Sequence, residues 1–350
     1  MKLISLAWLI VKTDKRIQKI MTDRKRDHID LAFRSHMENA LADKRFYYEP
    51  LLSAHPEKKL EPFDFLGKQL RTPIWVSSMT GGTEKAARIN LNLARACAQF
   101  DMGMGLGSCR SLLDSKDYFA DFDMRSVIGD DLPLYANLGI CQIESLIEDK
   151  ALEKLAAMLH DLRADGLIVH INPMQESLQP EGDLLKRPPI ETLQEMMAQI
   201  KVPIIVKEVG QGMGPRSIEA LMELPLQALE FGAFGGTNFA KIELMRHPEK
   251  AGQVLEALSE IGHNAEEMLD WANEIYENNK TVQCKELIIS GGVTSCLDGY
   301  YLIKKSKMPA IYGQASALLK YAQGEYTELE SYLKNQIKGL QLADAYLNLR

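Results

Sequence analysis

The chain has 350 residues, of which 46% are hydrophobic and 25% are charged, so it can bury a large core as a soluble globular protein. Its 48 acidic and 41 basic side chains give a net charge of -7, which argues against a general nucleic-acid-binding protein. An anionic small molecule is not excluded, because a few placed cations can hold it. The five cysteines are scattered and form no CxxC pair, which indicates a reducing, cytoplasmic setting without structural zinc.

The first apolar run covers residues 3–11 and is far too short to span a bilayer. It resembles the core of a secretory signal, but no small-x-small cleavage site follows it. We therefore expect residues 1–22 to be a dispensable N-terminal extension and the protein not to bind membranes. An amphipathic helix, or extra residues upstream of a true start at Met21, are alternative interpretations.

Residues 23–69 are expected to form an N-terminal helix and a connection to the next domain. The helix would begin at the adjacent cations Arg24 and Lys25 and run toward Ala42. Such cations are usually a solvated helix face. Alternatively, a segment that carries Arg and Lys can close over a phosphate group.

Eight short apolar runs follow residue 70, and each ends in glycine, serine or polar residues, as buried parallel strands do. They cover residues 73–78, 102–107, 132–137, 166–170, 202–207, 226–230, 286–290 and 308–312. Helical patterns lie between them at residues 85–100, 142–163, 190–200 and 215–222, with two more within 251–279. Eight such units predict an α/β fold, a (βα)8 TIM barrel over residues 70–350 with an N-terminal helical extension. A doubly wound sheet, which normally needs fewer strands, is the alternative.

The fourth run ends in a cluster of polar side chains, namely His170, Asn172, Gln175 and Glu176. The carboxyl ends of strands are where barrels and open sheets bind ligands. His170 and Asn172 are two residues apart and point to the same side if the strand continues through them, whereas Gln175 and Glu176 would lie on the following loop. A polar loop that only caps and turns the chain is the alternative interpretation.

Other strand ends also carry unusual residues. Lys207 ends the fifth apolar run, and a buried lysine is costly unless it meets an anionic partner. Glycine pairs accompanied by serine or threonine follow the first, sixth and seventh runs, at residues 80–82, 235–237 and 290–292. Backbone N–H groups of such loops bind phosphate in barrels, so the set predicts a phosphorylated planar cofactor across the barrel mouth.

Taken in order, these motifs resemble those of type 2 isopentenyl-diphosphate isomerase, the flavin-dependent enzyme that interconverts isopentenyl and dimethylallyl diphosphates. The motifs are Arg24-Lys25, Met79-Thr-Gly-Gly82, Gly107-Ser108-x-Arg110, His170-x-Asn172-x-x-Gln175-Glu176, Lys207-Glu-Val-Gly210, Gly235-Gly-Thr237 and Ser290-Gly-Gly292. The motif at residues 170–176 is the most specific of them. Gly232 departs from the pattern, because the family often has a serine there.

The resemblance implies that the protein binds FMN, Mg²⁺ and a diphosphate substrate, with NADPH as the reductant of the flavin. The residues implied to bind FMN are Ser78, Met79, Thr80, Gly81, Ser108, Asn137, Lys207, Thr237, Gly291, Gly292, Ala315 and Ser316. Those implied to hold the substrate are Arg24, Lys25, Ser108, Arg110, His170, Asn172 and Gln175. Glu176 would ligate Mg²⁺, and Gln175, with His170 and Asn172, would serve catalysis.

The implied chemistry agrees with the residue types. A diphosphate needs cations and a carboxylate-held Mg²⁺, and Lys207 suits the electron-rich edge of a reduced flavin. A double-bond shift protonates one carbon and deprotonates another, yet no carboxylate free for this work is obvious, because Glu176 would hold the metal and Gln175 cannot ionise. The family is thought to use the reduced flavin itself as acid and base.

An oligomeric assembly is expected, and two other functions are alternatives. Barrels with added helices often form symmetric multimers, so a homo-oligomer, a tetramer or octamer, is expected. Another FMN-dependent barrel oxidoreductase, such as a 2-hydroxy-acid oxidase, is the main rival, although the histidine motif and arginines that it would need are not found. A catalytically silent FMN-binding protein is the second rival. The presence of Arg24-Lys25 and Gln175-Glu176 argues against it, because holding a flavin requires neither pair.

Overall fold

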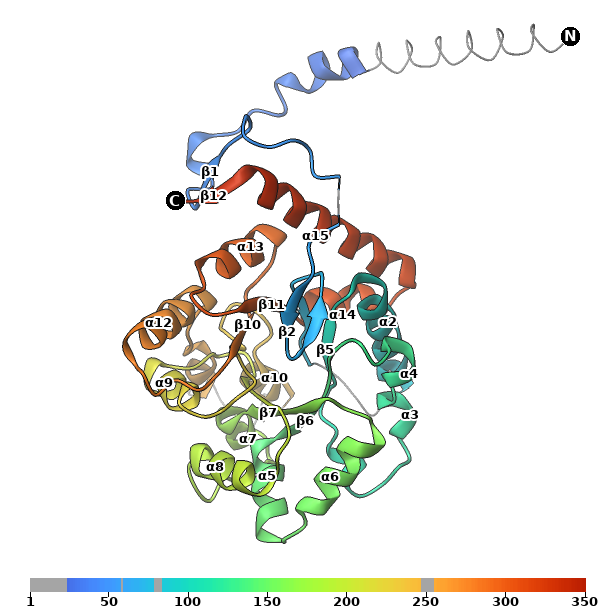
Figure 1. The fold of residues 1–350 in the computed structure, drawn as a ribbon, viewed down its shortest axis with the longest axis vertical. Coiled ribbons are helices and arrows are strands. Elements are labelled where there is room, and N and C mark those ends of the chain that lie inside the picture. Colours follow the sequence, from blue (N-terminus) through green and yellow to red (C-terminus); the bar gives the residue numbers. More distant parts are fainter. Residues whose placement is uncertain (1–23, 58, 79–83, 247–254) are drawn as a thin grey trace, which may run out of the picture. The chain divides into compact units, whose positions relative to one another are not determined.

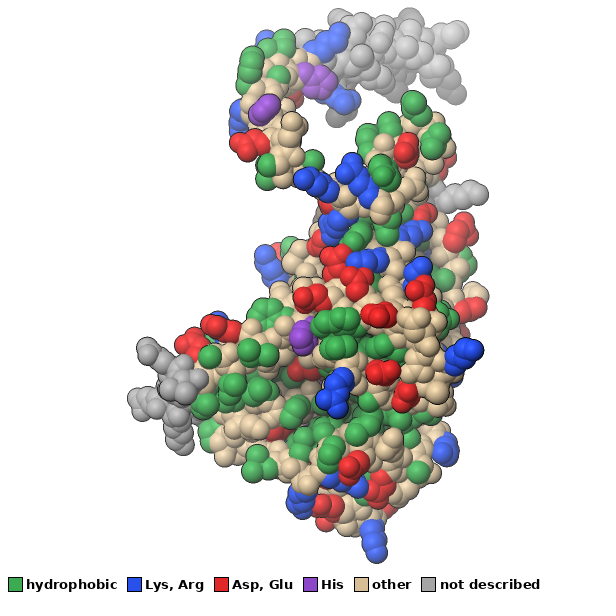
Figure 2. All heavy atoms as spheres, turned by 90° about the vertical axis from the view of Figure 1, so that its left-hand side faces the viewer, with side chains coloured by type: hydrophobic (Ala, Val, Ile, Leu, Met, Phe, Trp, Pro, Cys, Tyr) green, Lys and Arg blue, Asp and Glu red, His purple; other side chains and the backbone are tan. Residues whose placement is uncertain are grey.

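The computed structural model describes residues 24–57, 59–78, 84–246 and 255–350, and the chain divides into two units. The first unit comprises residues 1–47 with Arg350, and the second comprises residues 48–349. In the first unit, residues 24–32 are helical and the 3-10 helix η1 (Asn39–Leu41) follows. The helix predicted to run toward Ala42 is therefore shorter than expected. Hydrophobic side chains lie at the surface of this unit (Figure 2), among them Phe33, which is 90% exposed.

The second unit contains a closed barrel of eight parallel strands that neighbour one another in chain order (Figure 1). The strands are β4 (Ile74–Val76), β5 (Gly103–Gly105), β6 (Leu134–Gly139), β7 (Gly166–Ile171), β8 (Ile204–Glu208), β9 (Ala228–Glu230), β10 (Glu286–Ser290) and β11 (Ala310–Gln314). Pairing of β11 with β4 closes the barrel, with Tyr312 opposite Ile74. All eight predicted strands and the TIM barrel are confirmed, and the doubly wound alternative is wrong.

Helices cover the outside of the barrel (Figure 1). The longer ones are α2 (Glu84–Phe100), α5 (Ile140–Glu148), α6 (Leu152–Asp161), α8 (Pro189–Gln199), α9 (Pro215–Met222), α10 (Phe239–Arg246), α12 (Ala265–Asn278), α13 (Cys296–Lys305), α14 (Ser316–Ala322) and α15 (Tyr326–Tyr346). Side-chain capping fixes some of their starts: the Asn264 side chain accepts from Glu267 N, and the Glu267 carboxylate accepts from Asn264 N in return.

Shorter elements fill the connections. They are β1 (Phe46–Tyr48), β2 (Phe63–Phe65), β3 (Lys68–Leu70), η2 (Arg110–Leu113), α3 (Phe119–Phe122), α4 (Arg125–Ile128), α7 (Pro173–Leu178), η3 (Ala257–Glu260) and β12 (Leu347–Leu349). The single helical pattern predicted at residues 142–163 is wrong, because α5 and α6 are separate helices. Lys150 lies between them with a φ of 52°, a left-handed conformation that ends the first helix. Two helical patterns were expected within residues 251–279. Residues 251–254 lie outside the described residues, and the rest of this span contains η3 and α12.

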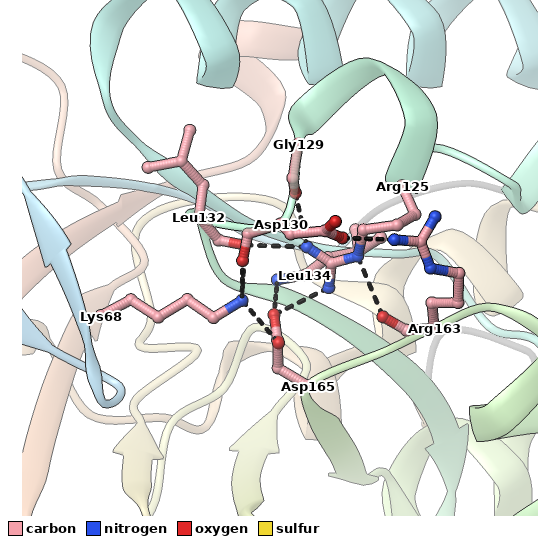
Figure 3. A network of polar contacts seen from close by, with 8 residues as sticks. All are labelled: Lys68, Arg125, Gly129, Asp130, Leu132, Leu134, Arg163 and Asp165. Carbon is pink, nitrogen blue, oxygen red and sulfur yellow. Dashed lines mark hydrogen bonds and ion pairs between the residues drawn. The ribbon is translucent and has the colours of Figure 1, made fainter.

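A buried arginine network joins the amino-terminal ends of two barrel strands (Figure 3). The Arg125 side chain is 2% exposed, and its guanidinium donates to Asp165 Oδ2 at 2.8 Å and to the Leu132 carbonyl at 3.0 Å. Asp165 in turn accepts from Leu134 N at 2.9 Å and pairs with Lys68 at 2.5 Å. Since Leu134 begins β6 and Asp165 precedes β7, the network holds the barrel at the end away from the strands' carboxyl termini.

Among the helices of the described residues, none combines the length and the apolar character needed to cross a membrane.

Candidate functional site

A cavity of about 360 Å³ lies at the carboxyl ends of β8, β9, β10 and β11. Several residues assigned to the flavin line it, namely Ser78, Lys207, Thr237, Gly291, Gly292, Ala315 and Ser316. Asn137 and Ser108 do not line it, while Met79, Thr80 and Gly81 lie outside the described residues. The structure thus brings together most of the described residues that were expected to hold FMN.

Two glycines let the loops around this cavity approach one another closely. Gly291 has a φ of +90°, and a Cβ there would lie 2.1 Å from the Ala233 carbonyl oxygen. Gly232 has a φ of +54°, and a Cβ there would lie 2.2 Å from the Glu208 carbonyl oxygen. Larger residues at both positions would strain the backbone. The departure at Gly232 therefore matches the local packing of this chain, which has no room for a serine without movement.

Buried polar groups line the same cavity. Glu230, 1% exposed, accepts a hydrogen bond of 2.5 Å from Ser77 Oγ on its Oε1. Its Oε2 and the Ser78 hydroxyl are buried without a hydrogen-bond partner among the described residues. Lys207, 7% exposed, lies directly opposite Glu230 on the neighbouring strand, and its Nζ donates to the Glu208 carbonyl at 3.3 Å. The cavity therefore offers a cation and two unsatisfied polar atoms to a ligand.

His170 connects this cavity to the polar motif at the end of β7. Its Nδ1 is 2.9 Å from Asn137 Oδ1 on β6, and Lys207 is its ladder partner on β8. Burial, helped by the nearby positive charge of Lys207, lowers the pKa of His170 from 6.5 to about 3. The imidazole is therefore neutral at physiological pH and offers a hydrogen bond but no charge.

The rest of the motif begins the short helix α7, so the expectation that Gln175 and Glu176 lie on a loop is wrong. Asn172 Nδ2 donates to Glu176 Oε1 at 2.9 Å and to Gln175 Oε1 at 3.3 Å. The second Glu176 oxygen accepts from Asp183 N at 3.0 Å. Asn172 Oδ1 is buried without a partner among the described residues, so it can still receive a donor.

Glu243 is a buried carboxylate of the site that sequence reasoning missed. Its Oε1 accepts from Gln175 Nε2 at 3.2 Å, and Arg246 pairs with it at 3.0 Å. It is 1% exposed and shares the buried face of α10 with Ala240 and Leu244. A glutamate on an otherwise apolar helix face was the sequence signal that could have found it.

Arg110 meets a second acidic side chain that was not predicted. Its Nη1 lies 3.0 Å from Asp183 Oδ2, which also accepts from Gln142 Nε2 at 3.2 Å. Ser108, two residues before Arg110, is exposed and lies in the loop that follows β5. Arg24 and Lys25 belong to the first unit, where both are exposed, and their role in substrate binding stays a prediction.

Curated relatives identify the family. An isopentenyl-diphosphate delta-isomerase of Rickettsia felis (strain ATCC VR-1525 / URRWXCal2) is 31% identical over 333 residues, covering 93% of this chain and 92% of that protein. An isopentenyl-diphosphate delta-isomerase of Rickettsia akari (strain Hartford) is 33% identical over 310 residues, covering 87% of each. The chain belongs to the isopentenyl-diphosphate delta-isomerase family. The family that the sequence motifs indicated is thus confirmed, although no family model matches the chain.

Solved structures support the barrel. A mandelate oxidase mutant with a monooxide FMN adduct superposes with a TM-score of 0.54 at 12% identity, covering 87% of this chain and 88% of that one. The flavin-binding domain of baker's yeast flavocytochrome b2 superposes with a TM-score of 0.58 at 14% identity, covering 85% of this chain and 71% of that one. At such low identity these similarities show a shared fold alone.

Proposed function

We propose that this protein interconverts isopentenyl diphosphate and dimethylallyl diphosphate with bound FMN and Mg²⁺, in isoprenoid biosynthesis. The proposal rests on one observation in this member of the family: the cavity and the polar motif of residues 170–176 lie on neighbouring strands. The cavity with Lys207 adjoins the polar motif with His170, because these two residues are ladder partners on β7 and β8.

The cavity fits FMN in its donor and acceptor groups. The glycine loops at residues 235–236 and 291–292 bring backbone close to the cavity, where N–H groups can bind a phosphate. Lys207 supplies a positive charge suited to the electron-rich edge of a reduced flavin. The unsatisfied oxygens of Ser78 and Glu230 supply further hydrogen-bonding groups, which a ligand with several polar atoms would satisfy.

The diphosphate would be held on the other side, by the residues around α7. Arg110 offers a guanidinium that is 61% exposed and suited to phosphate oxygens. His170 and Asn172 would add neutral hydrogen bonds. Arg24 and Lys25 would add two further cations to the substrate-binding set.

Glu176 would hold Mg²⁺. Among the described residues no group of three or more His, Cys, Asp or Glu side chains is placed to bind a metal ion. A single carboxylate fits Mg²⁺ all the same, because this ion is usually bound through one or two carboxylates together with substrate phosphates and water. Metal binding would therefore depend on the diphosphate.

The proposed chemistry is a proton shift without net oxidation. When bound, reduced FMN would supply the acid and base that move the allylic proton, and NADPH would serve to reduce it. The chain would orient the reacting carbons through Gln175, whose amide is fixed by Asn172 and Glu243. Neutral His170 would hydrogen-bond the substrate without adding charge.

The homo-oligomer, a tetramer or octamer, also remains part of the proposal. Exposed apolar side chains support it in each unit by itself: Phe33 and Met37 in the first, and Leu51 and Leu52 in the second. Light scattering after size-exclusion chromatography would measure the assembly.

The first experiment is to purify the protein and record its visible absorption spectrum. We expect a yellow protein that releases FMN on denaturation. In the Glu176→Gln variant we expect the same FMN content, together with a weaker response of isomerase activity to Mg²⁺. A colourless protein that binds no added FMN would refute the proposal. Loss of FMN in the variant would show that Glu176 belongs to the flavin site instead.

A further inference from the structure

Glu230 is a buried carboxylate in the cavity, and the proposed function uses it only as one of several hydrogen-bonding groups without a specific role. It ends β9, is 1% exposed, and lines the cavity together with Ser77 and Lys207. One oxygen, Oε1, accepts from Ser77 Oγ at 2.5 Å. The other, Oε2, is buried without a hydrogen-bond partner among the described residues. A carboxylate oxygen left in this state is costly, so it is expected to receive a donor when the cavity is filled.

The charge of Glu230 is not neutralised by Lys207, the cation opposite it in the barrel. Lys207 is its ladder partner on β8, yet no ion pair within 4.0 Å joins the two side chains in the described structure. Instead, Lys207 Nζ donates to the Glu208 carbonyl. Two side chains of opposite charge therefore line one cavity without touching. A ligand that carries an acceptor near a donor could satisfy both of them.

The polarity of Glu230 restricts which part of a ligand can face it. A carboxylate repels phosphate oxygens, so the phosphate end of FMN is expected at the glycine loops and not beside Glu230. The parts of FMN that can donate a hydrogen bond in both the oxidised and the reduced state are the N3–H group of the ring and the hydroxyls of the ribityl chain. Either one would satisfy Oε2.

We propose that Glu230 accepts a hydrogen bond from the flavin through Oε2 and thereby positions it and opposes the charge effect of Lys207. This inference rests on the FMN-binding part of the proposed function. A negative charge beside the flavin disfavours the anionic reduced form, whereas Lys207 favours it. The two side chains together would set how much more tightly reduced FMN binds than oxidised FMN.

The test compares the FMN-loaded wild type with Glu230→Gln, which keeps the shape but removes the charge. We expect the ratio of oxidised to reduced FMN dissociation constants to rise about tenfold in the variant, equivalent to a rise of about 30 mV in a two-electron reduction potential. The matched control is Glu286→Gln. Glu286 is a carboxylate at the start of β10 that accepts from Leu66 N at 2.9 Å and lies outside the cavity. The control is expected to keep the wild-type ratio.

FMN analogues identify the donor. If the ring donates, N3-methyl FMN abolishes the difference between wild type and Glu230→Gln. If a ribityl hydroxyl donates, an analogue that lacks those hydroxyls abolishes it. A difference that survives with both analogues would overturn the proposed contact.

The outcomes separate this inference from the proposed function. An unchanged ratio in a folded, FMN-loaded Glu230→Gln protein that still isomerises would overturn the role of Glu230 alone. Failure of the wild type to bind FMN would overturn both. Should Glu230→Gln not fold, Glu230→Asp retracts the carboxylate by one methylene. Its FMN affinity is then expected to fall at least tenfold, and an unchanged affinity would contradict the contact.

Discussion

Gln175 Nε2 donates a hydrogen bond of 3.2 Å to Oε1 of Glu243, which joins α7 to the buried face of α10. An amide can present either its oxygen or its nitrogen to a neighbour, and a carboxylate can only accept when ionised. Glu243 therefore fixes which end of the Gln175 amide faces it. The opposite end accepts from Asn172 Nδ2 at 3.3 Å. Gln175 is held from both sides, which suits the substrate-orienting role that the proposed function gives it.

Replacing Glu243 with glutamine is expected to lower kcat for the isomerisation by about 10- to 100-fold, since a hydrogen bond to a charged group contributes about 1.5–3 kcal/mol. The FMN content should stay at the wild-type level. Steady-state kinetics with flavin quantification would measure both. Arg246→Gln is the control, because Arg246 is 63% exposed and its pairing with Glu243 is solvent-screened. Equal losses in the two variants would contradict the positioning role of Glu243.

Asp183 competes with the diphosphate for Arg110 in the proposed site. Because their 3.0 Å ion pair is exposed, it stabilises by at most about 1 kcal/mol. The Asp183→Asn variant is therefore expected to lower KM for isopentenyl diphosphate by up to about fivefold, with kcat little changed. Lys186→Gln, which removes an exposed ion pair with Glu148, should leave KM unchanged. A higher KM in Asp183→Asn would mean that Asp183 helps to hold the substrate.

His170 should make the stability of the protein depend on pH. Its pKa is about 3 in the folded protein and 6.5 in the unfolded chain, so between these values only the unfolded chain takes up the proton. His170 therefore leaves the free energy of unfolding unaffected well above pH 6.5, and lowers it progressively as the pH falls from 6.5 toward 3. From pH 7.5 to 5.5 the wild type should lose about 1–2 kcal/mol more than His170→Gln.

Urea unfolding at the two pH values would measure this loss. His160→Gln is the control, because the His160 side chain is 90% exposed and the substitution should leave the wild-type pH dependence intact. A His170→Gln variant with the same pH dependence as the wild type would show that the imidazole is not held neutral.

Arg125 should matter for stability and not for catalysis. Its guanidinium is 2% exposed and satisfies carbonyl and carboxylate groups at the far end of the barrel from the site. Arg125→Met is expected to lower the free energy of unfolding by about 3–5 kcal/mol, because it breaks a buried network. Arg163→Met removes an exposed pair with Asp130 and should cost less than about 1 kcal/mol. Thermal unfolding with FMN content measured in parallel would check both variants.

The barrel could be predicted from the sequence because every strand is an apolar run bounded by polar or glycine-rich residues. In β8, for example, Ile204 to Val206 are buried apolar residues, and Lys207 and Glu208 mark the carboxyl end. The break between α5 and α6 could not be predicted in the same way. Apolar residues such as Leu146 and Leu155 continue the helical pattern across it, and the left-handed backbone of Lys150 separates the two helices.

The site was predictable where its residues are contiguous and not where they come from distant elements. His170 and Glu176 stand out within one short motif. Glu243 and Asp183 approach that motif from another helix and another loop, so their contacts depend on the folded barrel. Glu230 resembled an ordinary strand-terminal residue in the sequence, and only its burial without a second partner sets it apart.

The most direct test of the account is to incubate the FMN-loaded, reduced protein with isopentenyl diphosphate and follow the product by NMR. With Mg²⁺ and NADPH or dithionite, we expect dimethylallyl diphosphate to form at equilibrium with the substrate, and a chelator or reoxidation to stop it. No isomerisation under reducing conditions with Mg²⁺, or the same rate with chelator and oxidised flavin, would contradict the proposed function.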